Sequence, residues 1–553
     1  MHETRVSELT RHFFRRFFEN DVVQGGDDMV TTVVRALAIV AAPGLMFAFW
    51  LQNQYPQRPR WGRIEDEYFF VLFSFVAMAG VAIFEWEMLF PDRLDFVVLT
   101  PLSLRPWEMY AAKSIALAMF LGLFLGATNF FGMLMLPAVM KGHFFRDVGA
   151  HTVATLAAGV FGALLVTLLG GVLLCLLPAT IFRSVSLVFR LVAVTALGLL
   201  LIHYARFGDS MQGLLANDGE HMRWVPTFWF LGLYQSIQHG GAAPGFAFVM
   251  TRRADIALAA VLVGVVAVYP AAWNRMRRLA VEGDITKSAG RGERLRGVVH
   301  AVIRRPEERA VFHFVGQTMA RNGRYHVYMA IYFGAGLAIA ISCATRVVIV
   351  DGVAKPGLST FGLHAVMPLL VFWTIAGLKM AFAFPLQLDA RWIFRSTGAS
   401  LERCILAVRK WALACGAAVV LLVTATLAYL SWDPRELLVQ TVCDACLTAL
   451  LVDFFFFAED SVPFSKPRRP GRTSLPLVLT LYLGVLTPFI FGIVLLETRI
   501  EKNLLLLTAV VGAVPVVHWL LQRLRERAVL IEEEREGAGG EFQLLGVSGE
   551  LSS

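Results

Sequence analysis

Long apolar runs divided by short polar segments are the main pattern in this chain. A helix that spans a bilayer needs roughly 20 mostly apolar residues. About twelve runs of that length occur, centred near residues 40, 76, 122, 162, 194, 265, 338, 372, 421, 447, 486 and 512. The fifth run is the least regular, because Arg183 and Arg190 interrupt its start. The pattern predicts an all-α, polytopic integral membrane protein.

Amphipathic segments precede the first and the seventh run. Residues 5–19 carry charged side chains on one helical face and apolar ones on the other, among them Val6, Leu9, Phe13, Phe14, Phe17 and Phe18. Before the seventh run, the apolar face consists of Val311, Phe314, Val315 and Met319. Both segments predict helices that lie along the bilayer surface.

The runs divide six and six around a basic segment, and two loops resemble each other. Phe90-Pro91 and Leu94-Asp95 correspond to Phe384-Pro385 and Leu388-Asp389 at a constant offset, which Glu108 and Glu402 keep. Lys113 and Lys410 correspond after a short slip. We interpret this as a duplicated unit. The expected parts are a first six-span unit (1–280), a basic linker with the second amphipathic helix (281–325), a second unit (326–527) and a tail (528–553).

Composition supports membrane insertion and sets the orientation. The chain of 553 residues is 57% apolar with 43 Phe and a net charge of +8. Lys and Arg gather in the segments on the same side as the N-terminus, so both termini are expected in the cytosol. The positive charge then indicates contact with anionic lipids and not with nucleic acid. The six cysteines lie mostly in apolar runs, so no disulfide framework is expected.

Enzymatic motifs are missing from the sequence. There is no Gly-x-x-x-x-Gly-Lys-Ser/Thr phosphate loop, no His-Glu-x-x-His and no Gly-x-Ser-x-Gly. Cys443 and Cys446 have metal-like spacing but read as packing residues, so no metal site is expected. Four cations fall within runs, where charge is costly: Arg35, Lys113, Arg190 and Lys379. Lys113 is expected to pair with Glu85 or Glu87, and Arg190 with Asp444 or Asp453.

The segment from Phe84 to Lys113 resembles the cytosolic loop of ABC-type exporter permeases, the membrane subunits of type-2 exporters. The likeness rests on its acidic start, the Pro91-Asp-Arg93 turn, an apolar strip and a Glu and a Lys in the next span. The resemblance implies that an ATPase subunit pushes on these loops, through Glu85, Pro91, Asp92, Arg93, Asp95, Arg105, Glu108 and Lys113 in the first and Leu388, Asp389, Arg391, Glu402 and Lys410 in the second. It also implies an elbow helix with Phe13, Phe14, Arg15, Phe17 and Phe18.

The same resemblance implies a function and partners. The chain would be the permease of an ATP-driven exporter in the cytoplasmic (inner) membrane of a bacterium, working by alternating access on an amphipathic or lipid-like substrate. No cofactor is expected in this chain, because a separate cytosolic ATPase, expected as a dimer, would bind the ATP. The second loop lacks the Pro-Asp-Arg turn, so its contact with the ATPase is expected to be weaker.

Two other functions stay open from the sequence. An ion-coupled secondary transporter would use carboxylates at mid-membrane depth or broken helices. Asp444 is the one plausible deep carboxylate, and Pro43, Pro270 and Pro515 interrupt helices. The second alternative is a membrane-embedded enzyme or a scaffold, and the missing motifs disfavour the enzyme.

Overall fold

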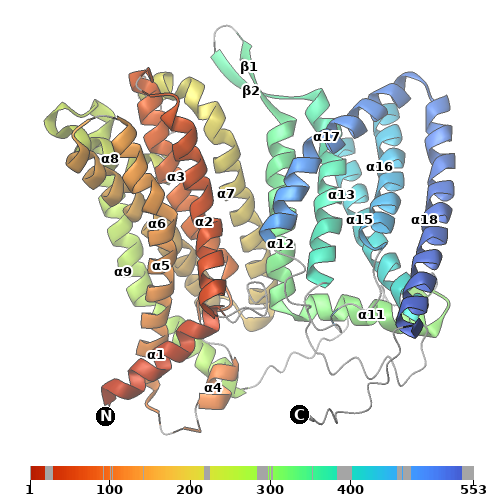
Figure 1. Cartoon of the computed structure of the whole chain (residues 1–553), viewed down its shortest axis with the longest axis horizontal. Coiled ribbons are helices and arrows are strands. Elements are labelled where there is room, and N and C mark those ends of the chain that lie inside the picture. Colours follow the sequence, from red (N-terminus) through yellow and green to blue (C-terminus); the bar gives the residue numbers. More distant parts are fainter. Residues whose placement is uncertain are drawn as a thin grey trace, which may run out of the picture.

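A computed structural model gives the architecture (Figure 1). It describes residues 2–18, 29–55, 57–90, 93–99, 101–102, 104–140, 142–216, 224–282, 297, 299–300, 303–350, 353–382, 401–457, 464 and 475–538. Figure 1 shows these residues as two groups of upright helices, with α1 to α9 in one group and α11 to α18 in the other.

The first group holds nine helices among the described residues. They are α1 (His2–Phe18), α2 (Met29–Gln52), α3 (Arg60–Phe84), α4 (Arg93–Leu99), α5 (Pro106–Met140), α6 (Phe144–Leu176), α7 (Ala179–Ala216), α8 (Pro226–His239) and α9 (Gly245–Glu282). A 3-10 turn, η2 (Gly240–Ala242), follows α8. Pro106 and Pro226 begin α5 and α8, where the missing amide hydrogen of proline costs nothing.

Among the described residues, the second group contains six long helices, one amphipathic helix and a hairpin of two strands. These are α11 (Pro306–Arg321), α12 (Gly323–Ala344), β1 (Thr345–Val350), β2 (Val353–Leu358), α13 (Thr360–Phe382), α15 (Leu401–Tyr429), α16 (Pro434–Phe455), α17 (Leu475–Lys502) and α18 (Leu505–Ala538). The antiparallel strands were not expected from the sequence. Strand β1 contains the β-branched run Val347–Val350, which favours strand over helix.

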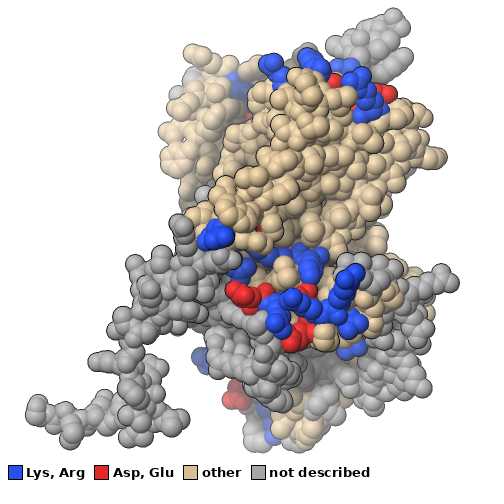
Figure 2. Space-filling view, turned by 90° about the vertical axis from the view of Figure 1, so that its right-hand side faces the viewer, with Lys and Arg blue, Asp and Glu red and all other residues tan. Residues whose placement is uncertain are grey.

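Eleven helices among the described residues are long and apolar enough to cross a membrane. They include Ser184–Tyr204 within α7, the least regular of the predicted spans. Helix α17 lies where the remaining predicted span was expected. Figure 2 shows charged residues at two levels of the visible face, with an uncharged band between them. An all-α polytopic membrane protein is therefore confirmed as the fold class.

The ends of the bundle differ in what they carry. Figure 1 shows α1, α4 and α11 at one end and the β1–β2 hairpin at the other, which we call the elbow end and the hairpin end. Helix α1 lies across α5 and buries Phe13, Phe17 and Phe18 against Phe120 and Phe124. The predicted apolar face of this helix is therefore used largely for packing on protein.

Corresponding helices of the two groups choose corresponding partners. Helix α1 packs on α5 as α11 packs on α15, and the pairs α3–α5, α5–α6, α3–α6, α3–α7 and α6–α9 recur as α13–α15, α15–α16, α13–α16, α13–α17 and α16–α18. The helices that follow the amphipathic ones break this rule. Helix α2 packs mainly on α5, whereas α12 packs on α13 and on α7 of the first group.

The contact between the groups depends on small residues. A methyl group at Gly198 of α7 would lie 2.8 Å from Cβ of Ala338 in α12, and one at Gly334 would lie 3.0 Å from Cβ of Val194. Thr195 donates a hydrogen bond of 3.3 Å to the carbonyl of Gly334. Glycine and alanine let the two backbones approach closely, which is how membrane helices associate without a hydrophobic driving force.

Candidate functional site

Helix α4, at the elbow end, is the core of the loop that the sequence singles out. Of its side chains that the structure describes, Asp95, Phe96 and Leu99 are buried, whereas Val98 is 62% exposed. Phe96 packs edge-on against Trp273 of α9, with ring centroids 5.7 Å apart. The short helix is therefore anchored on the bundle and presents Val98 on its outer side.

Asp95 ties α4 to two other helices. Its carboxylate forms ion pairs with Arg16 of α1 and with Lys113 of α5, the latter at 3.8 Å. The ammonium of Lys113 also lies over the rings of Phe13 and Phe17, 5.0 and 5.2 Å from their centroids. Lys113 is 1% exposed, so its side chain lies inside the protein and not on its surface. A buried ion pair with cation–π contacts joins the amphipathic helix, the loop helix and the third span.

Glu108 and Arg105 set the start of α5. Glu108 is buried in the first turn and accepts a hydrogen bond of 2.9 Å from the backbone amide of Arg105. This contact satisfies an amide that the helix itself leaves free, and a carboxylate is favoured at this end of a helix. Beside Glu108, a groove of about 720 Å³ lies between α1 and the first part of α5. Its lining includes Arg11, Phe14 and the exposed Trp107.

The beginning of the loop touches the second group. Glu85 is buried at the C-terminal cap of α3. The carboxylate of Glu87, at the end of an exposed and flexible side chain, lies beside Gly323, the first residue of α12. Phe84 packs against the core of the second group. A displacement of this loop therefore acts on both groups of helices.

The second predicted loop is described only at its end. Glu402 lies exposed in the first turn of α15, and Lys410 forms an ion pair of 2.5 Å with the buried Glu308 of α11. Lys410 thus contacts its amphipathic helix, as Lys113 contacts α1. Other predicted site residues fall outside the described residues: Pro91, Asp92, Leu388, Asp389 and Arg391, together with the side chain of Arg93. Arg15 is exposed on α1.

One predicted pairing is wrong. Arg190 is buried in α7, where it donates to the carbonyl of Ser186 and lies 5.8 Å from the ring centroid of Trp86. Asp453 pairs instead with Arg409 at 3.7 Å and with His518 at 2.5 Å. Arg190 lies in the first group and faces Trp86 of the α3–α4 loop, whereas Asp444 and Asp453 lie in α16 of the second group.

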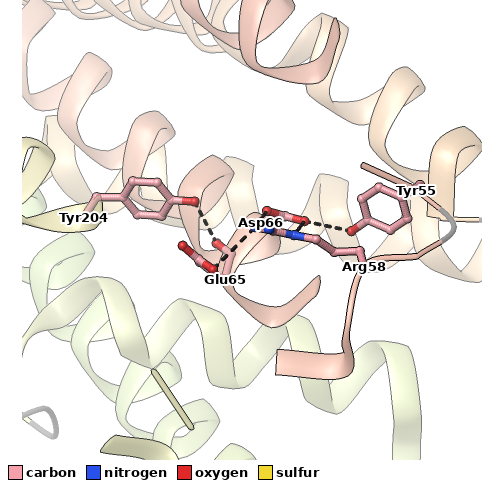
Figure 3. A network of polar contacts seen from close by, with 5 residues as sticks. All are labelled: Tyr55, Arg58, Glu65, Asp66 and Tyr204. Atoms are coloured by element: carbon pink, nitrogen blue, oxygen red, sulfur yellow. Dashed lines mark hydrogen bonds and ion pairs between the residues drawn. The ribbon is translucent and has the colours of Figure 1, made fainter. Parts of the chain in front are cut away.

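A polar network at the hairpin end was not predicted from the sequence (Figure 3). Arg58 forms an ion pair of 2.8 Å with Asp66, which is fully buried and also accepts a hydrogen bond of 2.9 Å from Tyr55. Tyr204 of α7 donates a hydrogen bond to the backbone carbonyl of Glu65 in α3. The hydrogen bond to Asp66 raises the pKa of the Arg58 guanidinium, and burial, followed by the charge of Asp66, raises the pKa of Tyr55.

Next to this network lies a second set of buried acids, in contact with α8. Glu67 of α3 accepts a hydrogen bond from Gln235, and Asp147 of α6 accepts one of 3.3 Å from Gln238. We call Asp66, Glu67 and Asp147, with the donors that meet them, the Glu67 cluster. An Asp-Glu pair at the start of an apolar run was the available signal, but it reads as loop charge until α8 covers it.

The described residues hold no group of three His, Cys, Asp or Glu side chains placed to share a metal ion. No protein family, curated protein or solved structure matches this chain. The function must therefore be argued from the geometry of the site.

Proposed function

We propose that this chain is the membrane-spanning permease of an ATP-driven ABC exporter, and that a separate cytosolic ATPase acts on the loop between α3 and α5. The observation that carries the proposal is the attachment of α4. Asp95 joins it to Arg16 and Lys113, while Val98 remains exposed on its outer face. An element fixed firmly on its inner side and apolar on its outer side is suited to receive a push from a partner.

The arrangement of the two groups supports the proposal. Packing partners recur between them, and Lys113 and Lys410 contact the amphipathic helix of their own group. A duplicated six-span unit would supply the two rocking halves that alternating access needs. Glu87 against Gly323 then links the pushed loop to the opposite half. The orientation with α1, α4 and α11 in the cytosol is part of the proposal.

Exposed apolar residues of the loop make the sharpest test. Val98, Leu102 and Trp107 are 62, 54 and 62% exposed. The doubly substituted Val98→Glu, Leu102→Glu protein and the wild type are purified from native membranes in mild detergent, and co-purifying proteins are identified. We expect an ATPase with the wild type and its loss from the variant. Asp95 is unsuitable, because a buried charge reversal would unfold the loop.

The matched control is Leu358→Glu, which places the same charge at an exposed apolar position at the hairpin end. It should retain the ATPase. If the folded wild type brings down no ATPase, the exporter proposal is wrong, and an ion-driven transporter becomes the leading function. Equal loss in both variants would show that the loop is not the contact.

A further inference from the structure

Four ionisable side chains of the second group meet where α13, α16 and α17 converge near the hairpin end. His364 of α13 lies between two glutamates of α17: its Nδ1 is 3.6 Å from Glu497 and its Nε2 is 3.7 Å from Glu501. The side chains of Glu501, His364 and Glu497 are 19, 7 and 1% exposed. Asp444 of α16 is fully buried. Burial thus increases along the series from Glu501 to Asp444.

Asp444 lies halfway along α16, about 15 Å from the end of the helix at a rise of 1.5 Å per residue. The charge of Glu497 acts on it across the helix contact. Neither oxygen of Asp444 meets a donor among the described residues, and Glu497 has only His364, whose Nδ1 lies 3.6 Å away. Two buried carboxylates that face each other are unstable if both are ionised.

A neighbouring amide also has an acceptor that meets no donor among the described residues. Gln440 is fully buried one turn before Asp444, and its amide nitrogen donates to the carbonyls of Leu363 and His364 at 3.4 and 3.1 Å. These bonds hold its side chain beside His364. Its oxygen Oε1 meets no donor among the described residues. An acceptor without a donor therefore adjoins Asp444, which likewise meets none in the described part of the chain.

Among the described residues no cation pairs with Asp444, and Glu497 has only His364 beside it. The charge acting on Asp444 is that of Glu497, and His364 is the cationic partner of Glu497. Near these acids, α15 contacts α16 through its residues Gly416 and Thr424. Helix α18 contacts α16 there through its residues Leu507 and Val510. The remaining ionisable groups that face the series lie at its outer end or on α16 itself: Asp433, Glu436, Cys443 and Lys502.

We infer that Asp444 and Glu497 form a proton-binding site, filled from the hairpin end through Glu501 and His364. One bound proton removes one of two facing charges and turns a carboxylate oxygen into a donor, which Asp444 otherwise lacks among the described residues. A shared metal ion is disfavoured, because the described acids and histidine are not placed to coordinate one. The inference does not depend on an ATPase partner.

A hydrophobic carbodiimide tests the site directly. Dicyclohexylcarbodiimide adds to a protonated carboxyl group in apolar surroundings and rearranges to a stable N-acylurea, so the full mass of the reagent remains on the residue. The wild type is labelled in mild detergent from about pH 5 to about pH 9, and the adduct is located by peptide mass spectrometry. We expect it on Asp444 or Glu497, falling about tenfold per pH unit above the titration.

Variants on one helix give the controls. Asp444→Asn and Glu497→Gln should each reduce labelling at least about tenfold, since the remaining acid no longer faces a second negative charge that favours its protonated form. Asp453→Asn should leave it unchanged, because Asp453 lies on the same helix but is paired with Arg409 and His518. Absence of labelling in the folded wild type overturns the inference. Protection by sodium at constant pH also overturns it, in favour of a sodium site.

Discussion

The two groups of helices bury acidic side chains in different ways. In the Glu67 cluster every acid has a partner: Arg58 and Tyr55 meet Asp66, and glutamines meet Glu67 and Asp147. In the second group Asp444 is equally buried but meets no donor among the described residues, and Glu497 has only His364 at 3.6 Å. The burial is the same, so the partners decide the role. Acids with fixed donors hold helices together, whereas acids without them remain available to bind and release a proton.

The largest expected effect is the loss of a cation from the satisfied cluster. Arg58→Met leaves the fully buried Asp66 without its ion pair, and breaking such a pair costs about 4 kcal/mol. Denaturant unfolding in detergent micelles measures the free energy of unfolding. The double variant Arg58→Met, Asp66→Asn should recover most of the loss. If Arg58→Met alone is as stable as the wild type, the cluster is not structural.

A comparison of the two aligned lysines should give the next largest effect. Lys113 is almost fully buried between Asp95 and two phenylalanines, so Lys113→Met should cost about 3 kcal/mol. Lys410 has a side chain that is 39% exposed, so Lys410→Met should cost about 1 kcal/mol. The same unfolding assay compares them. Equal costs would show that the two lysines play the same structural part.

Neutralising one acid in each group should change the free energy of unfolding in opposite directions. Asp66→Asn removes the ion pair with Arg58 and should cost about 2 kcal/mol. Asp444→Asn removes a buried acid that must either take up a proton or carry a charge without a partner in the folded state, and should raise the free energy of unfolding by about 1 kcal/mol near neutral pH. The unfolding midpoints of both variants are measured against the wild type. A destabilised Asp444→Asn would contradict the assignment of this acid as unsatisfied.

The smallest effect concerns Tyr55 and depends on pH. Tyr55→Phe loses one hydrogen bond to Asp66 and should cost about 1 kcal/mol at pH 7. The folded state raises the pKa of Tyr55, so its neutral form contributes stability below about pH 10 that is lost as pH rises further. Between about pH 8 and about pH 11 the wild type should therefore lose more stability than Tyr55→Phe. Parallel losses would show that Tyr55 does not contribute.

The spans were predictable from the sequence, because bilayer thickness sets the length of an apolar run almost regardless of tertiary context. The ion pair of Lys113 with Asp95 was not predictable. Glu85 and Glu87 are nearer to the end of the preceding span, but the turn of α4 directs Asp95 inward. The orientation of a seven-residue helix depends on its packing against α9, which no local pattern contains.

The buried acids divide in the same way. Asp444 stands out in the sequence as a carboxylate in the middle of an apolar run, and the structure places it there. Its neighbours were not predictable, because Glu497 and His364 lie near the ends of other helices, where a charge costs little until α16 covers it. Glu67 was missed for a related reason, since α8, which supplies Gln235, comes much later in the chain.

The contact between α7 and α12 has a consequence for biosynthesis. Helix α7 leaves the ribosome well before α12 is made, so its glycine-lined face at Gly198 first meets lipid or the insertion machinery instead of its final partner. This face of α7 stays without its final partner while α8, α9 and α11 are synthesised. Insertion of α12 then allows it to pack on α7, so the order of translation determines when the two groups of helices can associate.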